Sequence, residues 1–284
     1  MPAVSDDLLG ATIQYLEELK ACGVRTVRVS AETLAGLATP APRVQLPQPA
    51  VFAPTAPAPV PSEPAQGGRR DTPALSGDAR LQAVADLRAR VMGCVKCPHL
   101  VSSRTTVVFG VGNINAELMF VGEAPGADED RQGEPFVGAA GQLLTKMIQA
   151  MGLTRDSVYI ANILKCRPDT PGQAYGNRKP TQEEMQTCIP WLHEQIDIIR
   201  PKVLVGLGAT AIEGLLGKTA GIMRLRGQWH TYREIPLMPT YHPAFLLRNQ
   251  AASEKRKVWE DLLQVMEKLN LPITERQRAY FLKG

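Results

Sequence analysis

Residues 117–136 read ELMFVGEAPGADEDRQGEPF, an apolar run of strand length that passes directly into a loop rich in glycines and carboxylates. Further apolar runs of strand length follow, at residues 158–163, 203–207 and 235–240. Helical patterns lie between and after these runs, at residues 141–151, 181–199, 209–216 and 253–269. This alternation predicts an α/β fold: a three-layer α/β/α domain around a central, mostly parallel sheet of about four strands.

The rest of the 284 residues divides by composition. Residues 1–37 carry one amphipathic helical pattern and form a small N-terminal helical segment of unknown role. Residues 38–77 are rich in Pro and Ala, and bury too little apolar surface to offset the entropy of ordering, so we interpret them as a flexible linker. The folded domain is expected over residues 78–270, with residues 271–284 as a C-terminal tail.

The charge and the apolar segments restrict the class of protein. The formal net charge of +4 permits a polyanionic partner without requiring one. The acidic N-terminus lacks the basic segment and apolar run of a secretory signal, and the apolar run from Val203 to Ile212 is too short to span a bilayer. We therefore expect a monomeric, cytoplasmic protein without membrane association.

Three polar motifs follow predicted strands: the GEAPG of residues 122–126, Asn162, and His242 with Pro243. Because the carboxyl ends of parallel strands meet at one edge of a sheet, we expect these motifs to form one site. The planar amide of Asn162 suits reading the edge of a pyrimidine, and Phe136 suits stacking on a base. Each residue also has a plainer interpretation: Asn162 as a turn residue, Phe136 as a core anchor, and His242 as a hydrogen-bonded structural histidine.

Two further segments have competing interpretations. The carboxylates of residues 123–134 are suited either to positioning water in a reaction or to forming a solvated acidic loop that binds a divalent ion. The segment Gly206-Leu-Gly208-Ala-Thr-Ala211 resembles a dinucleotide-binding fingerprint. Residues 224–228 lack the acidic partner of that fingerprint, so we do not expect a nucleotide cofactor.

The five cysteines of the chain are Cys22, Cys94, Cys97, Cys166 and Cys188. An odd number spread thinly along the chain is a poor disulfide framework and indicates a reducing compartment. Cys94 and Cys97 form a CxxC, and with Cys166 and Cys188 they supply enough thiolates for zinc or an iron–sulfur cluster. The wide separations between these cysteines in the sequence favour the cluster. In the alternative interpretation, Cys166 and Cys188 bind nothing and are ordinary buried thiols. Cys22 precedes the linker, and we interpret it as a free thiol.

Several motifs occur in a fixed order between residues 87 and 269. They are CxxCP at Cys94, GEAPG at Gly122, PFVGxAGxLL from Pro135, Asn162 with KCRP at 165–168, the cysteine at 188, IRPK at 199–202 and YHP at 241–243. Together they resemble the family 4 uracil-DNA glycosylases, the iron–sulfur members of that superfamily. The resemblance implies base excision in DNA repair, with hydrolysis of the N-glycosidic bond of uracil in single- or double-stranded DNA and an abasic site as product.

The resemblance also implies a uracil pocket. Phe136 would stack on the base, the Asn162 amide would pair with O4 and N3, and His242 would stabilise the charge that grows on O2. The backbone of Gly122, Glu123 and Ala124 would contact the base as well. A [4Fe-4S] cluster with a structural role would be held by the four cysteines Cys94, Cys97, Cys166 and Cys188.

A carboxylate is expected to orient the attacking water. The best-known uracil glycosylases carry an aspartate just before the loop proline, and here that place is taken by Ala124. Glu123 is the preferred candidate and Glu129 the second. Basic residues near these motifs are predicted to contact DNA phosphates, namely Lys165, Arg167, Arg178, Lys179 and Arg248.

Two segments depart from the family pattern. Residues 169–177 are longer than expected, and the first 80 residues have no counterpart in the compact members, so residues 1–37 are a candidate tether for a protein partner. No histidine lies between His99 and His193, so we do not expect covalent trapping on DNA. The rival interpretations are a catalytically silent iron–sulfur DNA-binding module of the same fold and an iron–sulfur electron carrier.

Overall fold

The computed structural model describes residues 77–170, 177–217 and 221–282. The predicted helical segment of residues 1–37 and nearly all of the predicted linker lie outside these residues. Among the helices of the described residues, none is both long enough and apolar enough to cross a membrane.

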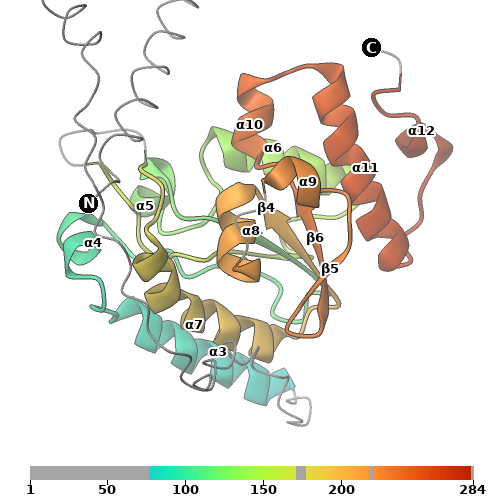
Figure 1. Cartoon of the computed structure of the whole chain (residues 1–284). Coiled ribbons are helices and arrows are strands. Elements are labelled where there is room, and N and C mark those ends of the chain that lie inside the picture. The colour runs from blue at the N-terminus through green and yellow to red at the C-terminus, as the bar shows by residue number, and fades with distance from the viewer. Residues whose placement is uncertain (1–76, 171–176, 218–220, 283–284) are drawn as a thin grey trace, which may run out of the picture. The chain divides into compact units, whose positions relative to one another are not determined.

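Six strands form one sheet at the centre of the domain (Figure 1). They are β1 (Val111–Gly112), β2 (Leu118–Gly122), β3 (Tyr159–Asn162), β4 (Val203–Leu207), β5 (His230–Tyr232) and β6 (Ile235–Thr240). Their order is β1-β3-β2-β4-β6-β5. The four inner strands pair in parallel, whereas β1 and β5 pair antiparallel at the two edges. The chain leaves β2 for β3 on one side and later returns to β4 on the other, which places a ligand-binding crevice at the carboxyl ends of these strands.

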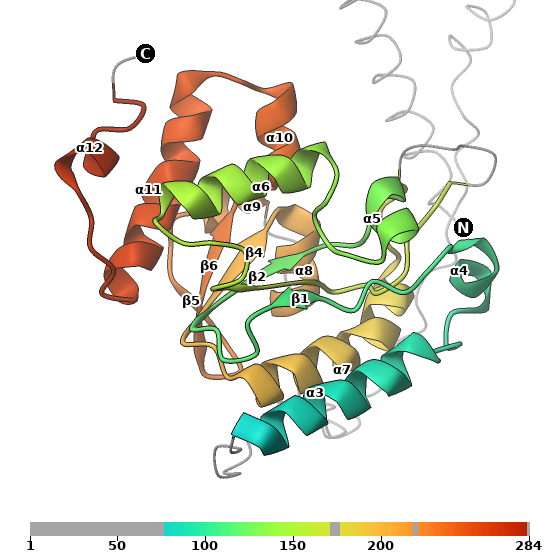
Figure 2. The same ribbon diagram turned by 180° about the vertical axis from the view of Figure 1, so that it is seen from behind.

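Helices precede, connect and follow the strands. They are α3 (Gly77–Met92), α4 (Pro98–Ser103), α5 (Ala127–Gln132), α6 (Ala139–Ala150), α7 (Gln182–Ile199), α8 (Ala209–Leu216), α9 (Ile222–Leu225), α10 (Pro243–Arg248), α11 (Ala252–Lys268) and α12 (Glu275–Arg278). Helices α3 and α7 lie side by side across one face of the sheet, and α6, α10 and α11 cover the other (Figures 1 and 2). These are the three layers that the sequence predicts.

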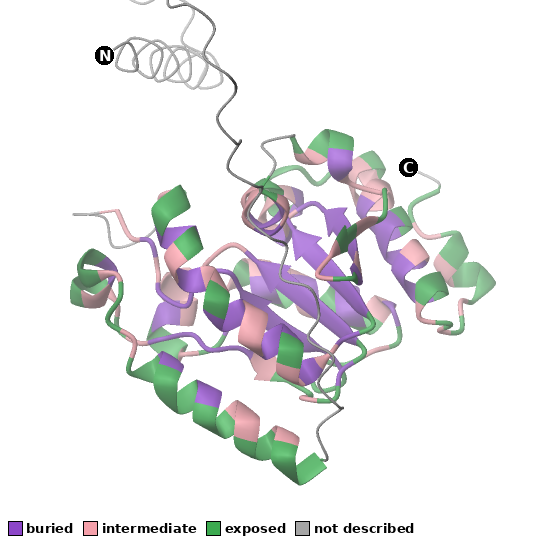
Figure 3. Ribbon diagram, turned by 60° about the horizontal axis from the view of Figure 1, so that its bottom comes forward, coloured by how far each residue is buried: buried purple, intermediate pink, exposed green. Residues whose placement is uncertain are grey.

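The period-2 geometry of the strands divides the core into two parts. Met119 and Val121 of β2 pack with buried residues of α3, α7 and α8. Leu118 and Phe120 of the same strand pack with buried residues of α6 and α11. A strand that is apolar on both faces is typical of a parallel sheet covered by helices on both sides. Figure 3 shows the inner strands buried and the outward faces of the helices exposed.

The sequence prediction is confirmed for the inner sheet and for the longer helices. The four predicted strands are β2, β3, β4 and β6, and the predicted helix at 209–216 matches α8 residue for residue. Helix α7 begins with a capping box, in which Thr181 Oγ1 accepts from the Glu184 N–H and the Glu184 carboxylate accepts from the Thr181 N–H. The sheet has two more strands than predicted, because β1 and β5 contain only two and three residues.

Residues 271–282, which fall in the predicted C-terminal tail, pack against the domain. Gln277 of α12 donates from Nε2 to the Ala150 carbonyl over 2.8 Å, and its own carbonyl accepts from Trp259 Nε1 over 2.6 Å. The ring of Tyr280 lies with its centroid 5.2 Å from that of Trp259. These contacts tie the end of the chain to α6 and α11.

Candidate active site and cysteine cavity

Residues from three separate motifs meet at the carboxyl ends of the strands. Gly122 ends β2 and lies beside Asn162, which ends β3. A Cβ atom on Gly122 would lie 2.3 Å from Asn162 Oδ1 and 2.6 Å from Phe136 Cζ, so only glycine leaves room for both side chains. The Phe136 ring centroid lies 5.6 Å from that of His242. The structure therefore brings together the predicted base-reading residues.

Asn162 presents an unused hydrogen-bond acceptor. Asn162 is only 2% exposed, and its Oδ1 atom is buried without a hydrogen-bond partner among the described residues. Leaving a buried acceptor unpaired destabilises a fold by about 1–3 kcal/mol, so native proteins rarely keep one without a reason. An acceptor of this kind is suited to a donor that a ligand brings.

Phe136 has a strained backbone that its neighbours hold in place. Its φ of 55° lies in the left-handed region, which an aromatic residue seldom occupies. Arg155 donates to the Pro135 carbonyl over 2.8 Å and to the Phe136 carbonyl over 3.1 Å. Strain that is fixed in this way is often found at ligand-binding sites, where it aims a side chain.

Glu129 holds the loop that carries Phe136. Its Oε1 accepts from the Val137 and Gly138 N–H groups, each over 2.9 Å, and its Oε2 accepts from the Gly126 N–H over 3.0 Å. These bonds join the GEAPG loop to the start of α6. The carboxylate is therefore already engaged by three backbone donors.

Glu123, the other candidate carboxylate, is half-buried and lines a large cavity. Burial raises the pKa of Glu123, whereas a hydrogen bond with Thr210 and the positive charge of Lys179 act in the opposite direction. A carboxylate with a raised pKa beside a cavity is suited to proton transfer or to holding a water molecule.

His242 is fixed as a neutral imidazole. It caps α10, where its Nδ1 accepts from the Ala244 N–H over 3.1 Å, which leaves Nε2 as the protonated nitrogen. Burial lowers the pKa of His242 to about 4, and the charge of Arg248 adds to this shift. Gly208 makes the close approach of β4 to this histidine possible: its φ is +92°, and a Cβ there would lie 2.9 Å from His242 Cβ. The fingerprint-like glycine is thus explained by packing against His242.

A buried ion pair that the sequence analysis missed holds the strand leading to His242. Asp261 of α11 accepts from Thr240 Oγ1 over 2.6 Å and from Arg226 Nη2 over 2.6 Å. The Arg226 guanidinium lies over the Tyr241 ring, 5.4 Å from its centroid. No sequence signal distinguishes Asp261 from the other charged residues of an amphipathic helix.

The large cavity has a volume of about 870 Å³ and opens beside these residues. Glu123, Ala124 and His242 line it. Phe136 and Asn162 are almost completely buried and do not line it. The Phe136 ring lies next to the lining residue His242, and both Phe136 and Asn162 lie against Gly122. The cavity is large enough for a nucleotide, with the base-reading side chains behind its lining residues.

The last residue of the long segment 169–177, of which residues 171–176 lie outside the described residues, also contacts this cavity. Asn177 lines it and donates from Nδ2 to the Pro125 carbonyl over 2.7 Å. Arg167, one of the predicted phosphate contacts, donates to Asn177 Oδ1 over 3.1 Å. Lys257, which was not predicted, lines the cavity together with the exposed Arg248.

The prediction that Lys165 contacts DNA is wrong. Lys165 is only 1% exposed, and its ammonium donates to the Asn162 carbonyl and to Gln195 Oε1 in the interior. The basic character of a residue in the sequence does not reveal on which face of the loop it lies. Two other predicted phosphate contacts form ion pairs: Arg178 with Glu184 over 2.5 Å and Lys179 with Glu213 over 2.6 Å.

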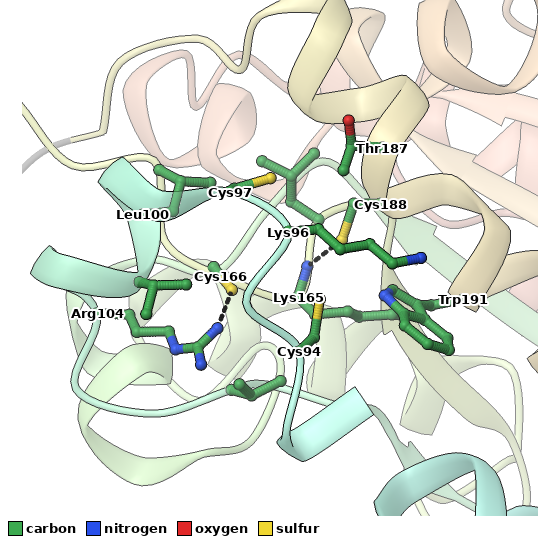
Figure 4. A pocket seen from close by; sticks show the side chains of 13 residues that line it. Cys94, Lys96, Cys97, Leu100, Arg104, Lys165, Cys166, Thr187, Cys188 and Trp191 are labelled. Carbon is green, nitrogen blue, oxygen red and sulfur yellow. Dashed lines mark hydrogen bonds between the residues drawn. The ribbon is translucent and has the colours of Figure 1, made fainter. Parts of the chain in front are cut away.

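The four candidate cysteine ligands gather around a second cavity, on the α3–α7 side of the sheet (Figure 4). Cys94 and Cys97 come from the turn between α3 and α4, Cys166 from the loop after β3, and Cys188 from α7. The cavity has a volume of about 20 Å³. Its other walls are mainly Leu, Val and Trp side chains.

Hydrogen-bond donors lie next to the sulfur atoms of Cys166 and Cys188. Arg104 donates to Cys166 Sγ over 3.1 Å, and the Lys165 N–H donates to Cys188 Sγ over 3.2 Å. Burial raises the pKa of Cys188 to about 12 and also raises that of Cys166. Buried thiols of this kind lose their protons when a bound cation replaces them. Donors aimed at sulfur stabilise the resulting thiolates.

The donor set fits a cluster better than a single metal ion. No three His, Cys, Asp or Glu side chains of the described residues stand close enough together to bind one ion. A tetrahedral zinc site needs four donors at about 2.3 Å from one point, whereas a cubane places an iron atom between each thiolate and the centre. Four cysteines around one cavity with Leu, Val and Trp walls are suited to the second arrangement.

Comparison with known proteins places these features in a family. The sequence model of the Uracil DNA glycosylase superfamily matches residues 109–263, which include the four parallel strands and the candidate site at their ends. A type-4 uracil-DNA glycosylase of Thermotoga maritima is 45% identical over 178 residues, or 61% of this chain and 88% of that protein. One from Sulfurisphaera tokodaii is 40% identical over 213 residues, or 72% and 92%. A type-5 enzyme of Pyrobaculum aerophilum is 31% identical over 192 residues, or 56% and 81%.

Proposed function

The chain belongs to the uracil-DNA glycosylase superfamily, in which it groups with the type-4 enzymes, and we propose that it removes uracil from DNA by hydrolysing the N-glycosidic bond. The observation that carries this proposal is the buried, unpaired Asn162 Oδ1, placed between the end of β2 and the Phe136 ring. A planar amide beside an aromatic ring is suited to binding one pyrimidine.

Recognition of uracil follows from the chemistry of that amide. Asn162 Oδ1 would accept from N3–H of the base, and the amide NH₂ would donate to O4. Cytosine presents an unprotonated N3 and an amino group at these positions, so both hydrogen bonds would be replaced by repulsion. Phe136 would stack on the base after it leaves the helix, an extrusion that costs roughly a few kcal/mol.

Cleavage of the bond between C1′ and N1 sends both electrons to the leaving base. Negative charge then grows on uracil O2 while the sugar becomes cationic. His242 would donate from Nε2 to that oxygen, because its Nδ1 is occupied as an acceptor from Ala244. A neutral donor held in one orientation stabilises the anion without giving up its proton.

We assign the water-positioning role to Glu123. Glu123 faces the large cavity, whereas the Glu129 carboxylate is engaged by the N–H groups of Gly126, Val137 and Gly138. In its ionised form Glu123 would orient water toward C1′, stabilise the cationic sugar and accept a proton from the water as the new C–O bond forms. Glu129 would instead position the loop that carries Phe136.

We further propose that Cys94, Cys97, Cys166 and Cys188 hold a [4Fe-4S] cluster. When bound, the cluster supplies four covalent links between the α3–α4 turn, the β3 loop and α7. The α3–α4 turn, the loop after β3 and α7 are far apart in sequence. The links between them would therefore hold the loop after β3, next to Asn162, in one position.

The DNA would lie across the large cavity. Arg248 and Lys257, which line it, and Arg167, which bonds to a cavity-lining residue, are placed to neutralise phosphates. The exposed position of Arg248 allows direct contact, whereas the ion pairs of Arg178, Lys179 and Lys257 with glutamates reduce the charge they can offer.

The test is an excision assay on an oligonucleotide with a single uracil, with an otherwise identical cytosine oligonucleotide as control. Iron-loaded protein is incubated with each, and alkali then cleaves abasic sites. We expect cleavage at uracil only, weakened by about 10²-fold or more in the His242→Ala variant. Absence of cleavage by folded, iron-loaded protein would contradict the proposal and favour a silent binding module.

A further inference from the structure

Lys165 is a buried lysine whose ammonium contacts only neutral groups. It donates to the Asn162 carbonyl over 2.8 Å and to Gln195 Oε1 over 2.6 Å. No ion pair joins it to a carboxylate of the described residues. A buried charge without a countercharge is strongly unfavourable, so a lysine kept in this place indicates that negative charge is close by.

The cysteine cavity supplies that negative charge. Lys165 lines the cavity, its N–H donates to Cys188 Sγ over 3.2 Å, and the next residue is Cys166 (Figure 4). Four thiolates around a [4Fe-4S] cluster leave the site with a net negative charge. Lys165 is a buried residue whose backbone contacts this site and whose ammonium contacts the strand end.

We propose that Lys165 is a positioning residue that couples the four-cysteine site to Asn162, so that an occupied cysteine site holds the base-reading amide in place. This inference rests on the proposed function, because it gives Asn162 the role of reading the base. One end of Lys165 is attached to the cysteine site through its backbone, and the other end holds the carbonyl of Asn162.

The hydrogen bond from Lys165 Nζ to the Asn162 carbonyl lies at the carboxyl end of β3, where the sheet ends. Asn162 is the last residue of β3, and beyond it the Ile163 N–H donates to the Gly122 carbonyl over 3.0 Å and the Leu164 N–H to the Glu123 carbonyl over 3.1 Å. Lys165 Nζ fixes the Asn162 carbonyl from the side of the cysteine cavity. The side-chain amide of Asn162 turns with its own backbone, so this bond sets the direction in which Oδ1 points.

Gln195 makes the far end of the connection rigid. Its Oε1 accepts from Lys165, while its Nε2 donates to the Phe109 carbonyl over 2.9 Å and to the Tyr159 hydroxyl over 3.1 Å. Tyr159 begins β3, the strand that Asn162 ends. The ammonium is therefore held between the Asn162 carbonyl of β3 and Gln195 of α7, and it cannot swing away without losing both partners.

Coupling between two sites is reciprocal. If the cysteine site fixes Asn162 through Lys165, then uracil bound at Asn162 must alter the surroundings of the cluster through the same residue. This gives a readout that does not depend on catalysis: the visible circular dichroism of the cluster, measured with and without free uracil.

The experiment compares full-length wild-type protein with Lys165→Met, which keeps the length of the side chain and removes its charge and donors. Lys202→Met is the control, because Lys202 pairs with Glu117 on the surface at the opposite end of the strands. Gln195→Met is a second variant, which leaves Lys165 and the cysteines in place and removes one anchor of the ammonium. Iron content, the response of the visible circular dichroism to free uracil, and single-turnover excision are measured for each.

We expect Lys165→Met to lose the response to uracil and to excise uracil about 10–100-fold more slowly, with Lys202→Met like the wild type. A Lys165→Met variant with normal iron, normal response and normal rate would overturn the coupling. If Lys165→Met fails to hold iron, Gln195→Met decides: a reduced response and rate at normal iron content support the coupling, and wild-type values contradict it.

Failure of the proposed function would look different. Wild-type protein would then release no uracil from DNA, whatever the variants do. A wild-type cluster spectrum that does not respond to free uracil, in protein that does excise uracil, would overturn the coupling alone.

Discussion

The base-reading site and the cysteine cavity lie on either side of β3, and they differ in how their polar groups are satisfied. In the base-reading site Asn162 Oδ1 is buried and unpaired, and Phe136 has a left-handed backbone. In the cysteine cavity, Arg104 and the Lys165 N–H donate to sulfur atoms. The first site keeps an unused acceptor for a ligand that comes and goes. The second already provides donors to two of its four sulfurs, Cys166 and Cys188, as suits a permanently bound group.

The largest effect should follow from removing the unused acceptor. We expect Asn162→Ala to reduce the single-turnover rate of uracil excision by about 10²–10³-fold, because both hydrogen bonds to the base are lost. The free energy of unfolding should stay the same or rise, since the variant no longer buries an unpaired oxygen. Excision kinetics and chemical denaturation measure the two quantities. A variant that lost both activity and stability would show that Asn162 serves the fold.

Substitution of a cysteine that lines the cavity should, in contrast, lower the stability of the protein. Cys188→Ser should lose most of its iron and unfold at a lower temperature, because the bound group contributes to folding as well as to the site. Cys22→Ser, outside the described residues, is the control and should keep both. Iron analysis and thermal unfolding monitor the change. Equal iron content in the two variants would remove Cys188 from the ligand set.

Substitution of Glu123 and substitution of Glu129, the two candidate carboxylates of the base-reading site, should have different effects. Glu123→Gln should slow excision by about 10²-fold with little effect on stability, whereas Glu129→Gln should mainly destabilise the loop. In the wild type, the rate should fall as the pH decreases through the raised pKa of Glu123, because only the ionised carboxylate accepts a proton. Loss of that dependence in Glu123→Gln tests the assignment. If Glu129→Gln lost the dependence instead, the two roles would be exchanged.

Protonation of His242 should lower stability in acid. Its pKa falls from 6.5 to about 4 on folding, so the folded state disfavours the charged form. The stabilisation is therefore complete above pH of about 6.5 and is lost as the pH falls toward about 4. The difference in unfolding free energy between wild type and His242→Gln, followed over this range, isolates the contribution. A constant difference would mean that His242 titrates normally.

The smallest effect should come from the support behind His242. Thr240→Val removes the hydroxyl that bonds to Asp261, and we expect it to lower the free energy of unfolding by about 1–3 kcal/mol. Excision should slow by less than about tenfold, because Arg226 still holds Asp261. Thr231→Val, on the exposed edge strand β5, is the control and should change neither.

The comparison also explains what the sequence could predict. Apolar runs set the four parallel strands, and motifs at their ends placed Asn162, Phe136 and His242 together, because strand periodicity and strand-end position are local properties. Lys165 was assigned to the surface because the sequence does not tell which way a loop residue turns. Asp261 was missed because its role depends on contacts with Thr240 and Arg226, far away along the chain.

We expect uracil to be released from DNA at this site as an intact base. The most direct measurement is the mass and amount of free base released from a uracil-containing oligonucleotide, together with the number of abasic sites formed. We predict equal amounts of uracil and abasic sites from the wild type, and neither from a cytosine oligonucleotide. Tight binding of the oligonucleotide by iron-loaded protein without release of any base would contradict the claim.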